Sequence, residues 1–459
     1  MMQLSQIAPV LHGRLVGGDA QCSAVSTDTR NIQPGDLFIA LKGEHFDGAQ
    51  FVAQAAEAGA VAAIVNEGGE LHGVTCPVLY VADTRLALGA LAAWWRRRFD
   101  LSLVAVTGSN GKTTVKEMLA AILRAHAGGE ERVLATRGNF NNDIGMPLTL
   151  LKLSESHRYA VIEMGMNHAG EIDYLSRIAQ PDVALVNNAS GAHLQGLGSV
   201  EGVARAKGEI FVGLPARGTA VINADDAHAA LWRTLAGEHR VYDFALTHAA
   251  AVKGDWQAQG YGGLLRARTP AGDLQVLLQV PGEHNARNAL AAATMALALH
   301  VPLSTIAQAL AAFGGVAGRL QRKPAVHGAT LIDDTYNANP ASMRAALEVL
   351  AQAPGKRIFV LGDMGELGEN AAQFHREIGI AARELGIERL FALGELSALA
   401  VGEFGTGARH FAGIEDLQKE LEQGLDAQTT VLVKGSRFMR MERVVHACAA
   451  QQEEACCSH

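Results

Sequence analysis

The chain has 459 residues, 49% of them hydrophobic and 19% charged, so it holds enough apolar material for about two to four domains. The formal net charge is −8, from 39 Lys and Arg against 47 Asp and Glu, which argues against broad binding to nucleic acid or to a membrane surface. The 50 glycines and an aromatic content of 5% favour a tightly wound α/β architecture over a disordered chain.

The five cysteines are scattered and form neither a disulfide framework nor a CxxC metal pattern, which favours a reducing, cytoplasmic location. The N-terminal residues lack a basic region followed by a long apolar run, so we expect no signal peptide. No run of about 18 apolar residues occurs, so we expect no membrane insertion.

The first of three α/β blocks covers residues 1–83. It combines short apolar strand patterns with a helical segment at residues 49–60. A second helical pattern, at residues 84–99, connects it to the next block. The strands expected in the first block lie at residues 36–41, 61–66 and 77–83.

The second block covers residues 84–315, and its apolar strands alternate with helical segments. This alternation is typical of a parallel sheet covered by helices on both faces. Residues 248–279 differ, because Gly turns and alternating apolar residues indicate an antiparallel ribbon appended to that sheet. The other strands are expected from residue 103 and at residues 132–136, 159–165, 183–188 and 219–223.

The third block covers residues 316–459 and predicts a second doubly wound unit, similar to a Rossmann domain. Two adjacent α/β domains leave a cleft between them, where ligand sites tend to lie. The strands expected in this block lie at residues 329–336, 357–364, 389–394 and 430–436, each followed by a plausible helix.

The segment "TGSNGKTT" follows the strand at residue 103 and opens a helix. Successive backbone N–H groups there would cradle phosphate, Lys112 could reach the terminal phosphates, and the Thr113 hydroxyl is placed to bind Mg²⁺. The usual loop has an earlier glycine, at the position that Val106 occupies. The nucleotide-binding residues expected are Gly108, Ser109, Asn110, Gly111, Lys112, Thr113 and Thr114.

Other polar residues follow the strands of the second block. Glu163 ends a buried strand and suits Mg²⁺, directly or through water, although a solvated strand end is the alternative. His193 lies in a Gly-rich loop, where a lone His is more often structural than a metal ligand. Asn139 and Asn141 crowd a turn near the phosphate loop, where amides can also serve backbone groups alone. For Lys207, local sequence favours a surface lysine on a helix.

These segments together closely resemble the bacterial Mur ligase family of peptidoglycan synthesis, over nearly the whole chain. The phosphate loop is shared by the whole family, including folylpolyglutamate synthases, and its shorter glycine pattern is normal there. The segments that carry the closer match are "TRGNFNNDIGMPLTLL", "NASGAHLQGLGSVEGVARAKGEIF", "PGEHNARNALAA", "GRLQ", "DDTYNANPASM", "VLGDMGELG" and "LVKGSRFMRME".

The resemblance implies an ATP-dependent amide ligase. ATP would phosphorylate the C-terminal carboxylate of a UDP-N-acetylmuramoyl-tripeptide, and the amine of D-Ala-D-Ala would attack the acyl phosphate, releasing ADP and phosphate. Two Mg²⁺ ions would bring the two anions together. The resemblance also implies that Lys207 is carbamylated. The catalytic residues implied are Lys112, Glu163, His193, Lys207 and Arg319, and the metal ligands are Thr113, Glu163, His193 and carbamylated Lys207.

Further contacts are implied by the same resemblance. For the nucleotide, the residues are Asn285, Arg319, Asp334 and Tyr336. Asn139 and Asn141 are expected to bind substrate, and Asn337 and Asn339 to face the incoming dipeptide. For a peptide carboxylate, the residues are Lys434, Ser436 and Arg437. For the uridine nucleotide, they are Asp28, Thr29, Arg30, Lys42 and Gly43. The alternatives are a linker salt bridge for Arg319, a strand-end cap for Asp334, a plain turn for residues 28–30 and closure of the sheet for residues 434–437.

Three other functions remain to be weighed. A ligase that adds diaminopimelate as the third residue of the peptide carries an Asn-Pro-Arg motif, where this chain has Ala341. A folylpolyglutamate synthase lacks a separate uridine-binding domain. A non-catalytic nucleotide switch would keep the loop but would need neither Glu163, His193 nor Lys207. We expect a monomer, and the third residue of the tripeptide is not determined by the sequence.

Overall fold

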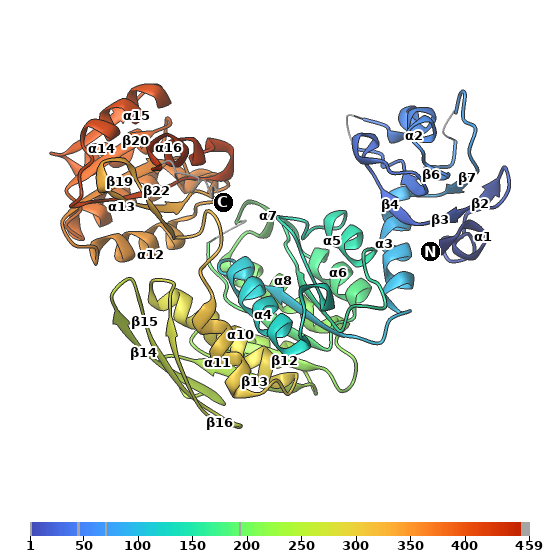
Figure 1. Ribbon diagram of the computed structural model, residues 1–459, viewed down its shortest axis with the longest axis horizontal. Coiled ribbons are helices and arrows are strands. Elements are labelled where there is room, and N and C mark those ends of the chain that lie inside the picture. Colours follow the sequence, from blue (N-terminus) through green and yellow to red (C-terminus); the bar gives the residue numbers. More distant parts are fainter. Residues whose placement is uncertain (1, 44–45, 69–70, 192–193, 451–459) are drawn as a thin grey trace, which may run out of the picture.

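The computed structural model describes residues 2–43, 46–68, 71–191 and 194–450, which form three α/β bodies in chain order (Figure 1). The N-terminal body has a sheet of five strands and a small two-stranded pair, the central body has nine strands and the C-terminal body has six. The expected α/β class is therefore confirmed. No helix among the described residues is long and apolar enough to cross a bilayer.

The N-terminal sheet consists of parallel strands with one antiparallel strand, β2, at its edge. Three strands coincide with the apolar runs of the sequence, whereas β2 and β4 lack such runs and were not expected. The elements are β1 (Met2–Gln3), α1 (Leu4–Ile7), β2 (Arg14–Val16), β3 (Gln21–Cys22), β4 (Ala24–Ser26), β5 (Asp36–Ile39), α2 (Val52–Glu57), β6 (Ala62–Asn66) and β7 (Val78–Val81).

Helix α3 (Thr84–Arg96) joins the N-terminal body to the central body. The Asp83 side chain caps it by accepting hydrogen bonds from the N–H groups of Arg85 and Leu86. Its buried residues Leu88 and Leu91 belong to one continuous apolar core that reaches from the first sheet into the central sheet. Because a single helix contributes to the packing on both sides, it couples the two bodies mechanically.

The central sheet has the order β16-β15-β14-β13-β12-β11-β8-β10-β9, and β14 to β16 form the expected antiparallel ribbon at one edge. Strand β13 was not expected. The strands are β8 (Ser102–Thr107), β9 (Val133–Ala135), β10 (Tyr159–Glu163), β11 (Val183–Val186), β12 (Thr219–Asn223), β13 (Arg240–Ala245), β14 (Val252–Gln259), β15 (Gly262–Thr269) and β16 (Gly272–Leu278).

Helices cover both faces of this sheet. On β8, Leu103 and Ala105 point into one apolar core while Val104 and Val106 point into the other, as the two-residue period of a strand requires. The helices are α4 (Lys112–Ala127), α5 (Gly145–Leu150), α6 (Glu171–Ala179), α7 (Leu194–Leu197), α8 (Val200–Gly208), α9 (Ala229–Leu235), α10 (Glu283–Ala298) and α11 (Leu303–Ala312).

The C-terminal sheet has the order β17-β18-β22-β19-β20-β21, parallel except for the edge strand β17, with an apolar core on each face. Its elements are β17 (Gln321–Pro324), β18 (Thr330–Asp334), α12 (Pro340–Ala351), β19 (Lys356–Gly362), α13 (Ala371–Glu384), β20 (Arg389–Leu393), α14 (Ser397–Phe404), β21 (Ala408–Phe411), α15 (Ile414–Gln423), β22 (Thr429–Lys434) and α16 (Glu442–Cys448).

The segment between α11 and β17, residues 313–320, connects the central and C-terminal bodies. Three of its residues have a positive φ: Gly315 at 98°, Gly318 at 70° and Leu320 at 48°. Glycine adopts this conformation freely, whereas leucine is strained in it and needs contacts that hold it there. The path of this connection is therefore set by its backbone geometry rather than by a helix or strand.

Candidate active site

The phosphate loop lies where β8 ends and α4 begins, in the middle of the central sheet. Gly111 precedes the helix in a left-handed conformation, with φ at 81°. A Cβ atom at this residue would lie 2.4 Å from Oδ1 of Asn288 and 2.7 Å from Nδ2 of Asn187. The loop therefore needs glycine here both for its φ angle and for the close packing of two amides.

Replacing Gly111 with alanine should weaken ATP binding by at least about tenfold, because left-handed strain of about 1–2 kcal/mol adds to the displacement of both amides. Gly128→Ala is the matched control. Gly128 also has a left-handed φ, of 78°, at the other end of α4, but no atom lies within 4 Å of its Cβ position. Equilibrium binding of ATP separates the two variants, and equal losses in both would contradict the packing argument.

Two asparagines at the end of β11 hold the phosphate loop, and the sequence did not single them out. Asn188 accepts the Asn110 N–H at 2.8 Å and donates Nδ2 to the Asn110 carbonyl at 3.0 Å. Asn187 donates Nδ2 to the same carbonyl and to Oδ1 of Asn288, both at 3.1 Å. The signal available in the sequence was a pair of amides directly after a buried strand. Both asparagines thus hold the loop through hydrogen bonds within the protein.

Lys112 lies over this loop. Its ammonium group donates to the Gly108 carbonyl at 2.7 Å and to the Ser109 carbonyl at 3.4 Å. Burial lowers the pKa of Lys112, the Glu163 carboxylate opposes this effect, and the nearby Arg319 adds to it. The side chain is thus close to the loop N–H groups, and a phosphate would offer it a stronger, charge-assisted partner than the two carbonyls.

Glu163 meets the start of α4. Its carboxylate accepts the Thr113 hydroxyl at 2.8 Å and the Asn141 amide at 2.8 Å. Only 2% of Glu163 is exposed, so the alternative of a solvated strand end is wrong. Arg319, from the connection to the C-terminal body, donates to the same Thr113 hydroxyl at 2.9 Å. Residues separated by about 200 positions therefore converge on one oxygen atom.

Lys207 is 1% exposed, so the expectation of a surface lysine is wrong. It lies on α8, whose inner face carries small residues such as Ala204, and this lets the lysine enter the core. Burial and the positive charge of Lys112 hold the pKa of Lys207 well below its usual value of 10.5. Among the described residues no hydrogen bond or ion pair to its ammonium group occurs. His193 lies outside the described residues.

The C-terminal body supplies a second set of contacts. Arg319 stacks on the Tyr336 ring, with its Cζ atom 4.2 Å from the ring centroid, and among the described residues it forms no salt bridge. Asn339 caps α12 and donates Nδ2 to Oδ1 of Asn110 at 2.7 Å. Together with the Arg319 bond to Thr113, this contact brings the C-terminal body directly onto the phosphate loop.

Several expected binding residues are already engaged by the protein. The buried Asp334 carboxylate accepts Lys434 Nζ at 2.6 Å and the Leu320 N–H at 3.1 Å, as a strand-end cap would. Burial raises the pKa of Asp334, although Lys434 opposes this effect. Ser436 donates to the Ala338 carbonyl at 3.3 Å. Lys434 and Ser436 thus join the carboxyl end of β22 to the end of β18 and the segment that follows it. This closure of the sheet was the alternative interpretation.

Two further candidates, Asn285 and Arg437, differ in burial and in their contacts with the rest of the protein. Asn285 is buried, and its amide donates to the Pro281 carbonyl at 2.8 Å and accepts from Asn288 at 3.3 Å. Arg437 is exposed and pairs with Glu442 at 3.4 Å. The Asn285 amide therefore helps to hold the start of α10 in place, whereas the exposed Arg437 guanidinium is accessible to a ligand. Within its own turn, Asn337 accepts the Ala338 N–H at Oδ1, and its carbonyl accepts Lys434 Nζ.

The uridine candidates lie in the N-terminal body, on the far side of α3 from the C-terminal body (Figure 1). Asp28 and Arg30 form an exposed ion pair with three side-chain hydrogen bonds, and Asp28 caps the short turn that contains Thr29. The Arg30 guanidinium holds the pKa of Asp28 at about 2. Lys42, next to Gly43, pairs with Asp47 at 3.7 Å. The structure agrees with the turn interpretation and does not bring these residues to the phosphate loop.

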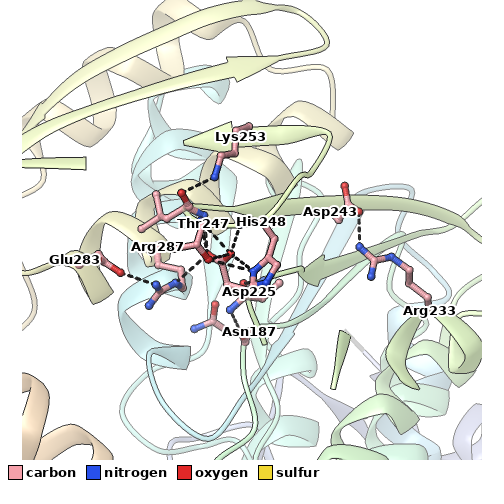
Figure 2. Close-up of polar contacts among 11 residues, drawn as sticks. Asn187, Asp225, Arg233, Asp243, Thr247, His248, Lys253, Glu283 and Arg287 are labelled. Atoms are coloured by element: carbon pink, nitrogen blue, oxygen red, sulfur yellow. Dashed lines mark hydrogen bonds and ion pairs between the residues drawn. The ribbon is translucent and has the colours of Figure 1, made fainter. Parts of the chain in front are cut away.

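A polar cluster surrounds Asp225, with Asn187 nearby (Figure 2). Its carboxylate accepts the N–H groups of Leu246, Thr247 and His248 and pairs with Arg287 of α10 at 3.6 Å. Burial acts to raise the pKa of Asp225, but these hydrogen bonds outweigh it and hold the pKa well below its usual range. The cluster joins β12, the β13–β14 connection and α10, and the sequence did not identify it.

A parallel sheet whose central strand leads through a glycine loop into a helix, with lysine, threonine and a strand-end carboxylate converging there, defines a P-loop nucleotide-binding enzyme. The chain belongs to the Mur ligase family. Family models match the "Mur ligase family, catalytic domain" at residues 21–96, the "Mur ligase middle domain" at 106–296 and the "Mur ligase, glutamate ligase domain" at 318–437.

Individual relatives cover almost the full chain. The UDP-N-acetylmuramoyl-tripeptide–D-alanyl-D-alanine ligase of Escherichia coli is 45% identical over 451 residues, which is 97% of each chain. A crystal structure of MurF from Acinetobacter baumannii has a TM-score of 0.89 at 39% identity and covers 96% of this chain and 97% of that one. MurF from Thermotoga maritima in complex with ADP has a TM-score of 0.81 at 26% identity, with 93% and 97% covered.

Proposed function

We propose that this chain is an ATP-dependent ligase that joins D-alanyl-D-alanine to UDP-N-acetylmuramoyl-tripeptide through an acyl phosphate, as part of peptidoglycan synthesis. The convergence of Lys112, Glu163 and Arg319 on the start of α4 is the observation that carries the chemistry. The relatives that carry the name of the dipeptide-adding ligase, including one 45% identical, support this substrate pair over the diaminopimelate-adding ligase and folylpolyglutamate synthase.

Different residues of the site bind the phosphates and the metal ion. The loop N–H groups and Lys112 bind the β- and γ-phosphates, and Arg319 holds the γ-phosphate from the opposite side. Thr113 and Glu163 offer one hydroxyl and one carboxylate oxygen, the donor set that Mg²⁺ takes together with phosphates. When bound, Mg²⁺ supplies positive charge that lets the carboxylate approach the γ-phosphate.

We propose that Lys207 is carbamylated. Its low pKa leaves a neutral amine, whose nitrogen can form a bond to the carbon of CO₂ while one proton passes to solvent. The resulting anion would face Lys112 and could hold a second Mg²⁺ with His193. ¹³C-bicarbonate should give a carbamate resonance in the wild-type protein that Lys207→Met lacks. Identical spectra for both would refute the modification.

Each of the three bodies binds a different substrate. Residues 1–83 bind the uridine nucleotide through Asp28, Thr29, Arg30, Lys42 and Gly43, and residues 84–315 bind ATP. Residues 316–459 close over ATP and bind the dipeptide, with Arg437 the candidate for its carboxylate because that side chain is exposed. We propose a cytoplasmic monomer.

Phosphate release tests this function directly. Purified chain with ATP and Mg²⁺ should release phosphate only when UDP-N-acetylmuramoyl-tripeptide and D-Ala-D-Ala are both present. Release without the dipeptide, or with any amino acid in its place, would contradict the substrate assignment. ATP binding without any substrate-dependent release would favour a nucleotide switch over a ligase.

A further inference from the structure

The tip of the β14–β15 ribbon reaches the connection between the central and C-terminal bodies. Tyr261, in the turn between these strands, donates its hydroxyl to the Leu320 carbonyl at 2.8 Å. Its ring packs against the apolar core of the C-terminal body and lies 5.5 Å from the Arg322 guanidinium. Within the described part of the chain, this is the single hydrogen bond that joins the β14–β16 ribbon to residues beyond 313.

The Tyr261 bond acts on a residue that is held on every side. Leu320 has φ at 48°, an unfavourable conformation for a leucine. Its N–H donates to Asp334 at 3.1 Å, its carbonyl accepts Tyr261, and its side chain is 7% exposed. On the other side of Arg319, the Gly318 carbonyl accepts the Tyr336 N–H at 3.1 Å. Both neighbours of Arg319 are therefore fixed in the backbone.

One side of this hydrogen bond faces a groove. A groove of about 440 Å³ runs beside it, lined by the ribbon tip, the end of β16 and the connection, including Leu278, Gly314 and Arg322. The groove leaves this side of the connection only partly packed, so the Tyr261 hydrogen bond is the specific restraint that the ribbon places on the Leu320 carbonyl. Burial raises the pKa of Tyr261, so the phenol remains a donor throughout the physiological range.

We propose that Tyr261 is a positioning residue, which fixes the Leu320 carbonyl so that Arg319 reaches the γ-phosphate of ATP. The proposal rests on the proposed function of Arg319. It assigns the appended ribbon a function in the reaction: the ribbon braces the connection between the two bodies from outside the nucleotide site.

Tyr261→Phe removes the hydroxyl and keeps the ring. Since one neutral hydrogen bond is lost, ATP affinity and substrate-dependent phosphate release should each fall about three- to tenfold, while ADP affinity stays unchanged because ADP lacks the γ-phosphate. Tyr242→Phe is the matched control. Tyr242 lies on β13 of the same sheet, and its hydroxyl accepts a bond from Arg240 instead of holding the connection.

A double-mutant cycle identifies the route of the effect. In an Arg319→Ala background, Tyr261→Phe should cause no further loss of ATP affinity. Three results would each overturn the proposal, since the hydroxyl would then act independently of Arg319. These are an equal loss of ATP affinity in both backgrounds, an equal loss of affinity for ADP and ATP, and loss of the fold in Tyr261→Phe. A wild-type chain without ligase activity would refute the proposed function instead, and the nucleotide-binding measurements would still test Tyr261.

Discussion

Replacing Lys112 with methionine is expected to lower substrate-dependent phosphate release by about 100- to 1000-fold, the range found when one charge-stabilising donor is removed from an active site. Methionine keeps the length of the side chain but cannot bind phosphate. Because the Lys112 ammonium bonds, within the described part of the chain, only to carbonyls of its own loop, the fold should survive, and the unfolding midpoint should change little. Steady-state phosphate release and thermal unfolding measure the two effects.

Lys356→Met is the matched control for this substitution. Lys356 is also half-buried and also donates its ammonium to a backbone carbonyl, that of Gly424 at 3.1 Å. It lies at the start of β19, the opposite end of that strand from the loops that follow the parallel strands. Comparable losses of activity in the two variants would mean that Lys112 acts through stability and not through the phosphates.

Lys207→Met should separate stability from activity. In CO₂-free buffer, where Lys207 carries no carbamate, a buried amine without a partner among the described residues destabilises the fold, so an apolar replacement of similar length should raise the free energy of unfolding by about 1–3 kcal/mol. Ligase activity should nevertheless fall at least about 100-fold, because the group proposed to hold the second Mg²⁺ is lost. Chemical denaturation and phosphate release are the two measurements. A variant that is both more stable and fully active would refute the proposed function of Lys207.

In CO₂-free buffer, the pH dependence of stability gives an independent test of unmodified Lys207. The lowered pKa in the folded state means that, between that pKa and 10.5, the unfolded chain binds a proton that the folded chain does not. The free energy of unfolding of the wild-type protein should therefore rise with pH across this window, relative to Lys207→Met. The two curves should run parallel below the lowered pKa. Parallel curves at every pH would contradict a neutral amine.

Lys116→Met provides the contrast. Lys116 is as buried as Lys207, at 1% exposure, but its ammonium donates to the Thr136 carbonyl at 2.6 Å and pairs with Glu117 at 2.6 Å. Removing it leaves the buried Thr136 carbonyl without this donor, so this substitution should destabilise the fold by about 1–3 kcal/mol. Opposite signs for the two lysines would show that the partner, and not burial alone, decides the outcome.

Continuous apolar runs were sufficient to predict the central parallel strands, because a strand buried on both faces must be apolar at every position. The strands that escaped prediction lie at sheet edges, in the small two-stranded pair or in partly polar segments, where pairing with a neighbour rather than apolar pattern decides the structure; they are β1, β2, β3, β4, β13, β17 and β21. The antiparallel ribbon was predicted from its alternation, but its contact with Leu320 was not, because nothing in residues 248–279 indicates which distant carbonyl its tip will meet.

The sequence by itself determined the α/β class, the phosphate loop and the membership in the Mur ligase family, since all three depend on short segments whose local geometry follows from their own residues. Only the tertiary structure decided that Lys207 is buried, that Asn187 and Asn188 hold the loop, and that Asp334 forms an ion pair with Lys434. The physical reason is that burial and ion pairing depend on which surfaces meet when strands and domains far apart in the chain come together.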